Sequence, residues 1–439
     1  MSRGAASLAI VLFLCANMVR LKAFGFDPPL PVPEGFNDIA TSRPDVEYST
    51  GSAPIRAAAV VPMIVLTLFI RDRSWMRHLG TGPGVWYWLL MAWLILTVPV
   101  SLLPLQVASS TAALVGVSLT VAWFTIEFGW LSLVRLVTGF VGAFTAVSMI
   151  WSLFRSHETF VAGRFQGVGM AATHFGEACG IALLLLVLYR RVLFRPLLSV
   201  GLMGLLSVSL LLSGTRGALG ATIVGLVVYF GVRSRVHLAT VLCCLLAITP
   251  ILIFTPMLDG ATVAVRRSPN EVGLSGRLEI WDGIAADAGE LAPTGVGYGL
   301  VFGGQSEYLT GQFKEGVASP SSLTYSHNML VGVFVVGGVI GLVLFGGLLA
   351  AYLWSTRRSS DRRLDAVLAF CVAVGVSEAA ILEAPMRVVS IVLVGLLTTV
   401  ALGSHRDDGE GRNTALISEH PARSEHFGDQ GQLTSSWIG

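Results

Sequence analysis

Four connections between the hydrophobic runs of this chain carry a cationic or titratable side chain in a polar setting. They are Gly163-Arg164-Phe165, Ser213-Gly214-Thr215-Arg216-Gly217, Ser275-Gly276-Arg277 and Ser326-His327-Asn328. The planar guanidinium of arginine offers a fixed fork of donors that matches phosphate oxygens two at a time. A neutral imidazole can take a proton from a hydroxyl group. Each arginine alone is equally compatible with a stray surface charge, but together these residue types favour chemistry on an anionic, phosphate-bearing substrate.

Arg216 and Arg277 are both predicted to lie in the first turn of a helix. Thr215 or Ser213 can cap the first helix, and Ser275 can cap the second. Apolar residues recur at helical spacing around Arg277, so this face is expected to pack on the membrane domain or enter the interface. These apolar residues are Leu274, Leu278, Trp281 and Ile284. A cation in a first turn opposes the helix dipole, but it suits a bound anion because free backbone N–H groups point the same way.

His327 stands at the predicted start of a spanning helix, where Ser326 or Asn328 can act as the cap. The positive end of the helix dipole favours the neutral imidazole, which is the form that can serve as a general base. An interfacial histidine satisfied by water is the alternative, and position alone favours that alternative.

Further residues near these segments are candidates for contacts with a substrate. They are Arg164, His174, Trp281, Asn328 and Arg387. His174 shares a predicted helix face with Glu177, and a carboxylate inside a membrane is a functional candidate. An ion pair with Glu383 is the favoured alternative for Arg387.

The segment Pro293-Thr294-Gly295-Val296-Gly297-Tyr298-Gly299 alternates glycines, which permit positive φ angles and close approach of backbones. No strand precedes it and no lysine follows at the position that a P-loop requires, which excludes a P-loop. A tight turn that ends the helix of Arg277 is expected instead.

Composition indicates a chain that is solvated mainly by lipid. Of 439 residues, 54% are hydrophobic and 13% are charged, against roughly 25% charged in soluble domains. The net charge of +2 is too small to indicate a nucleic-acid partner. The five cysteines lie in apolar runs without metal-ligand spacing, so we expect neither a metal nor another cofactor.

Hydrophobic runs long enough to span a bilayer predict an all-α, polytopic membrane protein with about twelve transmembrane helices. The runs lie near 5–22, 55–70, 85–103, 107–126, 131–154, 173–189, 197–213, 217–232, 238–256, 326–354, 365–382 and 386–403. Arginines gather in alternate short loops, which predicts cytoplasmic N- and C-termini. The expected divisions are 1–256 (helices 1 to 9), 257–325 (a periplasmic loop carrying short helices), 326–403 (helices 10 to 12) and 404–439 (a disordered cytoplasmic tail).

The ordered motifs around Arg216, Arg277 and His327, with the glycine segment and Gly337-Gly338-Val339-Ile340-Gly341, resemble the O-antigen ligase and polymerase superfamily of bacterial envelope assembly. The resemblance covers roughly residues 160–400, and Gly163-Arg164-Phe165-Gln166-Gly167 is similar to a further family element. Thr173-His174 departs from the asparagine-containing pair that many relatives carry.

This resemblance implies a GT-C-like fold and an enzyme of the bacterial inner membrane with a periplasmic active site. Such proteins move a glycan from an undecaprenyl-diphosphate carrier to an acceptor hydroxyl, without a metal or a nucleotide. The family's essential arginines correspond by motif to Arg216 and Arg277, and its essential histidine corresponds to His327. The implied partners are the lipid-linked glycan donor, a lipid A core or glycan acceptor, and membrane lipids.

Several functions stay open at the level of sequence. The favoured one is an inverting ligase in which the arginines bind the diphosphate and His327 takes the proton of the acceptor hydroxyl. A polymerase that joins lipid-linked repeat units uses the same donor chemistry. A transporter of an anionic substrate and a non-catalytic scaffold in glycan export are the alternatives of other classes.

Overall fold

A computed structural model of the chain describes residues 80–101, 104–161, 163–168, 172–232, 234–254, 328–357, 361–378 and 388–417. From the predicted external loop it describes residues 284, 289, 292, 294, 295, 297 and 298. The predicted spans near 5–22 and 55–70 lie outside the described residues.

Every other predicted span coincides with a helix. These helices are α4 (Gly82–Leu96), α5 (Pro104–Phe128), α6 (Trp130–Phe154), α8 (Ala172–Leu193), α9 (Pro196–Ser213), α10 (Arg216–Gly231), α11 (Arg235–Phe254), α16 (Met329–Ser355), α17 (Arg362–Glu378) and α18 (Val388–Ile417). Smaller elements are η2 (Val98–Val100), α7 (Ser156–Thr159), β1 (Phe160–Val161) and β2 (Arg164–Phe165). In the described part, 6 helical segments are long and apolar enough to cross a membrane. The protein is therefore an all-α membrane protein.

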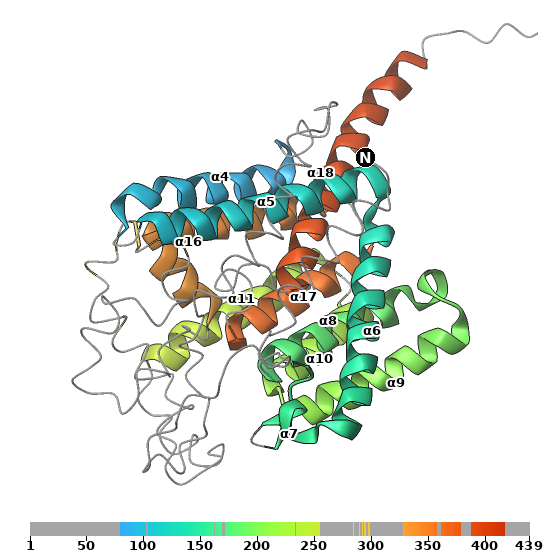
Figure 1. Cartoon of the computed structure of the whole chain (residues 1–439). Helices are drawn as coiled ribbons and strands as arrows, with labels where there is room; N and C mark the ends of the chain where they lie inside the picture. Colours follow the sequence, from blue (N-terminus) through green and yellow to red (C-terminus); the bar gives the residue numbers. More distant parts are fainter. Residues whose placement is uncertain are drawn as a thin grey trace, which may run out of the picture.

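The helices form two groups that meet at α18 (Figure 1). In the first group α4 runs beside α5 and packs along α16. In the second, α8 packs on α9, α10 and α6, while α17 packs along α10. α18 contacts α4 and α5 on one side and α6, α8 and α17 on the other.

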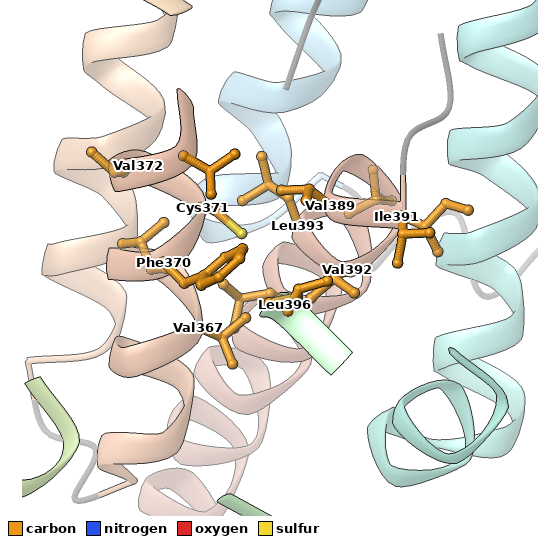
Figure 2. Packing of buried hydrophobic residues seen from close by; sticks show 14 of the residues in the cluster. Val367, Phe370, Cys371, Val372, Val389, Ile391, Val392, Leu393 and Leu396 are labelled. Carbon is orange, nitrogen blue, oxygen red and sulfur yellow. The ribbon is translucent and has the colours of Figure 1, made fainter. Parts of the chain in front are cut away.

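The contact between α17 and α18 is a layer of buried hydrophobic side chains. Figure 2 shows Val367, Phe370 and Cys371 of α17 facing Leu393 and Leu396 of α18. All but Leu393, which is 5% exposed, are fully buried. Because lipid tails are as apolar as these side chains, close packing rather than release from water holds such helices together.

Hydrogen bonds between neighbouring helices show which helix ends lie together. The indole N–H of Trp130 at the start of α6 donates to the Tyr189 hydroxyl near the end of α8 (2.9 Å). Arg135 donates to the carbonyls of Val192 and Leu193, the last residues before α8 ends (2.8 and 3.0 Å). At the other end of these helices, the backbone N–H of Val168 donates to Ser148 Oγ (3.1 Å).

We use "site end" for the end of the bundle at which α6, α9 and α17 finish and α8, α10 and α16 begin. This end carries Arg164, Arg216 and Asn328. The opposite end carries Arg190 and Arg191 in the last turn of α8, Arg195 before α9, and Arg362 and Arg363 at the start of α17. Among the described residues, the structure thus separates the arginines that the sequence assigns to the two sides.

Two helices differ from the expectation. α18 continues to Ile417, so the first part of the predicted disordered tail, 404–417, is helical. Extending an existing helix needs no new nucleation, which is its costly step. α16 is interrupted at Gly338, whose φ of 63° and ψ of −160° are not helical.

Candidate functional site

The turn between α9 and α10 is built around Gly214, whose φ of 60° lies in the left-handed region. A glycine in this conformation commonly ends a helix, because a side chain would be strained there. Its N–H donates to the carbonyl of Leu211 (3.0 Å). The turn reverses the chain in two residues, so that Arg216 opens α10 directly at the site end.

The N-cap position of α10 is predicted correctly, but no side-chain cap forms there. Thr215 is the N-cap residue but its hydroxyl makes no hydrogen bond to the helix. The hydroxyl instead donates to the carbonyl of Ala172 at the start of α8 (3.0 Å). Ser213 Oγ accepts the N–H of Thr215 (3.3 Å) rather than one from the first turn. The first turn of α10 therefore presents its N–H groups without a side-chain cap, beside an exposed Arg216.

Arg164 reaches this turn from a short hairpin. Strands β1 and β2 pair Val161 with Arg164, and Gly163 makes the reversal at a φ of 73°. The Nε of Arg164 donates to the carbonyl of Ser213 (2.8 Å), and its Nη2 donates to Thr215 Oγ1 (3.2 Å). The structure thus brings Arg164 to the turn that directly precedes Arg216. Arg164 uses two of its donors to hold the turn that presents Arg216.

Helix α8 supports the same turn from its other side. A Cβ on Gly176 would lie 2.5 Å from Thr215 Oγ1 and 2.6 Å from Ser213 Oγ, so glycine is required at this contact. His174 lies one turn before Glu177, partly buried in the first turns of α8. Glu177 is 1% exposed, which makes it a buried carboxylate close to the site end.

Asn328 begins α16 and ties it to α17. Its Oδ1 accepts the N–H groups of Leu330 (2.9 Å) and Val331 (3.3 Å), which confirms a helix cap at this residue. Its Nδ2 donates to the carbonyl of Val376 (2.9 Å). Both ends of the amide are thus engaged within the protein, so Asn328 positions the start of α16. A contact of Asn328 with substrate stays a prediction.

The start of α10 and the end of α17 lie at the same end of the molecule. A Cβ on Gly225 of α10 would lie 3.1 Å from the carbonyl of Ala366, near the start of α17. A Cβ on Gly180 of α8 would lie 2.9 Å from Thr222 Oγ1 and 3.3 Å from Phe370. The two helices therefore run in opposite directions, and the start of α10 and the end of α17 both lie at the site end.

Four predicted site residues lie outside the described residues. They are Arg277, Trp281, His327 and Arg387. In the sequence, His327 directly precedes the buried cap residue Asn328. Ile284, on the predicted apolar face that follows Arg277, is helical and 5% exposed. Its burial agrees with a face that packs on the rest of the protein.

The glycine segment has the positive φ angles expected of it, 69° at Gly295 and 94° at Gly297. The N–H of Gly297 donates to the carbonyl of Val336 in α16 (3.2 Å). The segment therefore packs against the break in α16. Sequence reasoning missed this break; Gly337-Gly338 inside a predicted span is the signal that points to it.

The described residues do not include a group of three or more His, Cys, Asp or Glu side chains that could hold a metal ion. What this part of the site can supply is positive charge and backbone N–H donors at the start of α10. Both suit an anion that approaches from the site end.

Fold and site together define a polytopic α-helical membrane protein in which Arg164 and Arg216 lie at the turn between α9 and α10. Residues 201–346 match the family model described as O-antigen ligase. Over the matched region, this match confirms the resemblance to the O-antigen ligase superfamily seen in the sequence. The matched region contains Arg216, Arg277 and His327, while Arg164, His174 and Arg387 lie outside it. A search of curated proteins gave no match.

Proposed function

We propose that this protein is an O-antigen ligase-like glycosyltransferase. It moves a glycan from undecaprenyl diphosphate to a hydroxyl of an acceptor such as the lipid A core, at the periplasmic face of the bacterial inner membrane. The observation that carries the proposal is the first turn of α10, where an exposed Arg216 and backbone N–H groups without a side-chain cap lie inside the region matched to the family.

The diphosphate is both the binding handle and the leaving group. The oxygen of the acceptor hydroxyl attacks the anomeric carbon from the face opposite the diphosphate, and the bond from that carbon to the diphosphate oxygen breaks. Negative charge grows on the departing undecaprenyl diphosphate. Arg216 and Arg277 stabilise this charge more in the transition state than in the ground state. His327 takes the proton of the hydroxyl, and the anomeric configuration is inverted.

This reaction draws on the energy of the sugar–diphosphate bond, so it needs neither ATP nor a metal. Arg164 acts mainly through the turn that it holds, because its Nε and Nη2 donate to Ser213 and Thr215. His174 and Arg387 are proposed to contact the glycan or the carrier, and Trp281 to offer an apolar surface for it.

A polymerase that uses a second lipid-linked glycan as the acceptor is the nearest alternative, because donor chemistry is the same. The break in α16 is a feature that transporters also have. At this break, however, the carbonyls of Val336 and Gly337 accept hydrogen bonds from Gly297 and Trp93 rather than facing a substrate path. Because these carbonyls already have partners within the protein, the enzyme is favoured over the transporter.

The decisive assay is transfer in proteoliposomes with purified protein, lipid-linked donor and acceptor, without added nucleotide. Replacing Arg216 by Ala should lower the transfer rate about a hundredfold, the usual loss when one transition-state donor is removed. Arg195→Ala is the matched control, since Arg195 is also exposed at a helix start but lies at the opposite end. Equal rates for the two variants would refute the role of Arg216. Donor crossing the bilayer without transfer would support the transporter.

A further inference from the structure

We propose that Trp93 and a short strap from the external loop position the outer half of α16, and through it the catalytic histidine. The strap comprises Thr294, Gly295, Gly297 and Tyr298. The inference rests on the proposed function for the role of His327, but the strap itself is argued from its contacts.

The break in α16 creates the need for such a strap. Gly338 has a φ of 63° and a ψ of −160°, a backbone region that is essentially restricted to glycine. The helix is therefore divided into an outer half, 329–337, and an inner half, 339–355. Carbonyls just before the break lose the N–H partners that an unbroken helix provides. In a membrane, each carbonyl left without a partner costs several kcal/mol.

Two donors from separate parts of the chain meet these carbonyls. The indole N–H of Trp93, on α4, donates to the carbonyl of Gly337 (2.8 Å). The backbone N–H of Gly297, in the strap, donates to the carbonyl of Val336 (3.2 Å). At the end next to the break, the outer half of α16 is thus held by both α4 and the external loop.

The strap fits this place only because it is made of glycine at the contact points. A Cβ on Gly295 would lie 2.5 Å from the carbonyl oxygen of Val335 and 2.6 Å from the backbone nitrogen of Gly337. Both are backbone atoms, which cannot move aside as a flexible side chain can. On the other side, a Cβ on Gly297 would lie 3.0 Å from Val107 of α5. Tyr298 follows with a fully buried side chain.

The other end of the outer half is fixed as well. Asn328 caps it and donates to the carbonyl of Val376 in α17. His327 is the next residue toward the loop, one peptide unit from this cap, or about 3.8 Å between Cα atoms. Because the outer half is held at both ends, the position of Asn328 is fixed, and this limits where the adjacent His327 can lie. The strap follows Arg277 in the same loop, so it also connects the loop that carries the second arginine to this half-helix.

The strap takes no part in presenting Arg216, because Arg216 is held by the start of α10. Loosening the strap should therefore affect the position of the base more than the binding of the lipid-linked donor. A displacement of about 1 Å in a reacting group can lower the rate about a hundredfold. The expected signature is a lower kcat with a nearly unchanged KM for the donor.

The test compares Gly295→Ala and Trp93→Phe with Gly289→Ala. Gly289 lies in the same loop, and a Cβ there would meet nothing within 4 Å. We expect kcat to fall about tenfold or more in the first two variants, with the donor KM and the Gly289→Ala enzyme close to wild type. Trp93→Phe removes one donor and keeps an aromatic ring, so it serves if Gly295→Ala does not fold. Unchanged kcat in Trp93→Phe, or a donor KM that rises in proportion, would overturn the proposal.

Amide hydrogen exchange of the same variants separates the strap from the proposed reaction. Faster exchange across 329–337, with 339–355 unchanged, is expected in Gly295→Ala and Trp93→Phe even if the wild-type protein transfers no glycan. Exchange equal to that of the wild type in both halves would overturn the strap. Absence of transfer by wild type alongside faster exchange would instead overturn the proposed function.

Discussion

At the scale of single residues, the site end shows a division of labour between two arginines. Arg164 directs its Nε and Nη2 into the turn at Ser213 and Thr215, while the side chain of Arg216 is exposed beside them. The fork of a guanidinium makes this possible, because one side chain can donate to a carbonyl and a hydroxyl at the same time. The turn between α9 and α10 is therefore rigid where it presents Arg216.

Replacing Arg164 by Lys should destabilise the protein even though the charge is kept. A lysine is a point donor that cannot reproduce the two bonds to Ser213 and Thr215, and each hydrogen bond from a charged donor contributes about 1.5–3 kcal/mol. The free energy of unfolding in detergent should fall by roughly that amount for one lost bond. Arg191→Lys, at an exposed position of the opposite end, is the control. Equal stability of the two variants would contradict the bracing role.

At the scale of elements, the helices follow from the sequence more closely than their ends and breaks do. Continuous apolar runs predicted α4 to α6, α8 to α11 and α16 to α18, because a spanning segment must satisfy its backbone internally. The cap of α10 was not predictable, since Thr215 has a competing carbonyl at Ala172 that is distant in sequence. The break at Gly338 depends on Trp93 and Gly297, which are likewise remote from it.

Two contributions of Asn328, the cap of α16 and the hydrogen bond to α17, can be measured separately. Asn328→Ala removes the cap, worth about 1 kcal/mol, and leaves the carbonyl of Val376 without its Asn328 partner, at a cost of about 1–3 kcal/mol. Asn328→Ser restores a cap acceptor but has no amide to reach α17. Unfolding measurements should place Asn328→Ser between wild type and Asn328→Ala. A Ser variant as unstable as the Ala variant would show that the cap contributes nothing.

At the scale of the whole molecule, the sequence predicted a separation of arginines onto two faces, and the helix ends show it. Arg216 and Asn328 lie at one end, and Arg191, Arg195 and Arg357 at the other. Which end faces the periplasm is a prediction from the arginine-rich loops. The approach of Arg277 and His327 to the site end is predicted from motifs in sequence order. Spacing alone cannot give it, because it depends on how the external loop folds over the helices.

The orientation is open to a direct labelling test. In a background with its cysteines replaced by alanine, Ser156→Cys introduces an exposed thiol at the site end and Ser234→Cys one at the opposite end. A membrane-impermeant maleimide added to spheroplasts should label Ser156→Cys and leave Ser234→Cys unlabelled until the membrane is opened. The reverse pattern would place the site in the cytoplasm and would contradict the proposed reaction with a periplasmic acceptor.

The central claim is that positive side chains from separate segments hold a lipid diphosphate next to an imidazole. An experimental structure of the protein in a lipid nanodisc with bound undecaprenyl diphosphate measures this most directly. We predict that the diphosphate contacts the guanidinium groups of both Arg216 and Arg277, with His327 facing the position of the departed sugar. A diphosphate bound away from α10, or Arg216 and Arg277 separated by more than about 10 Å, the screening distance between charges, would contradict the account.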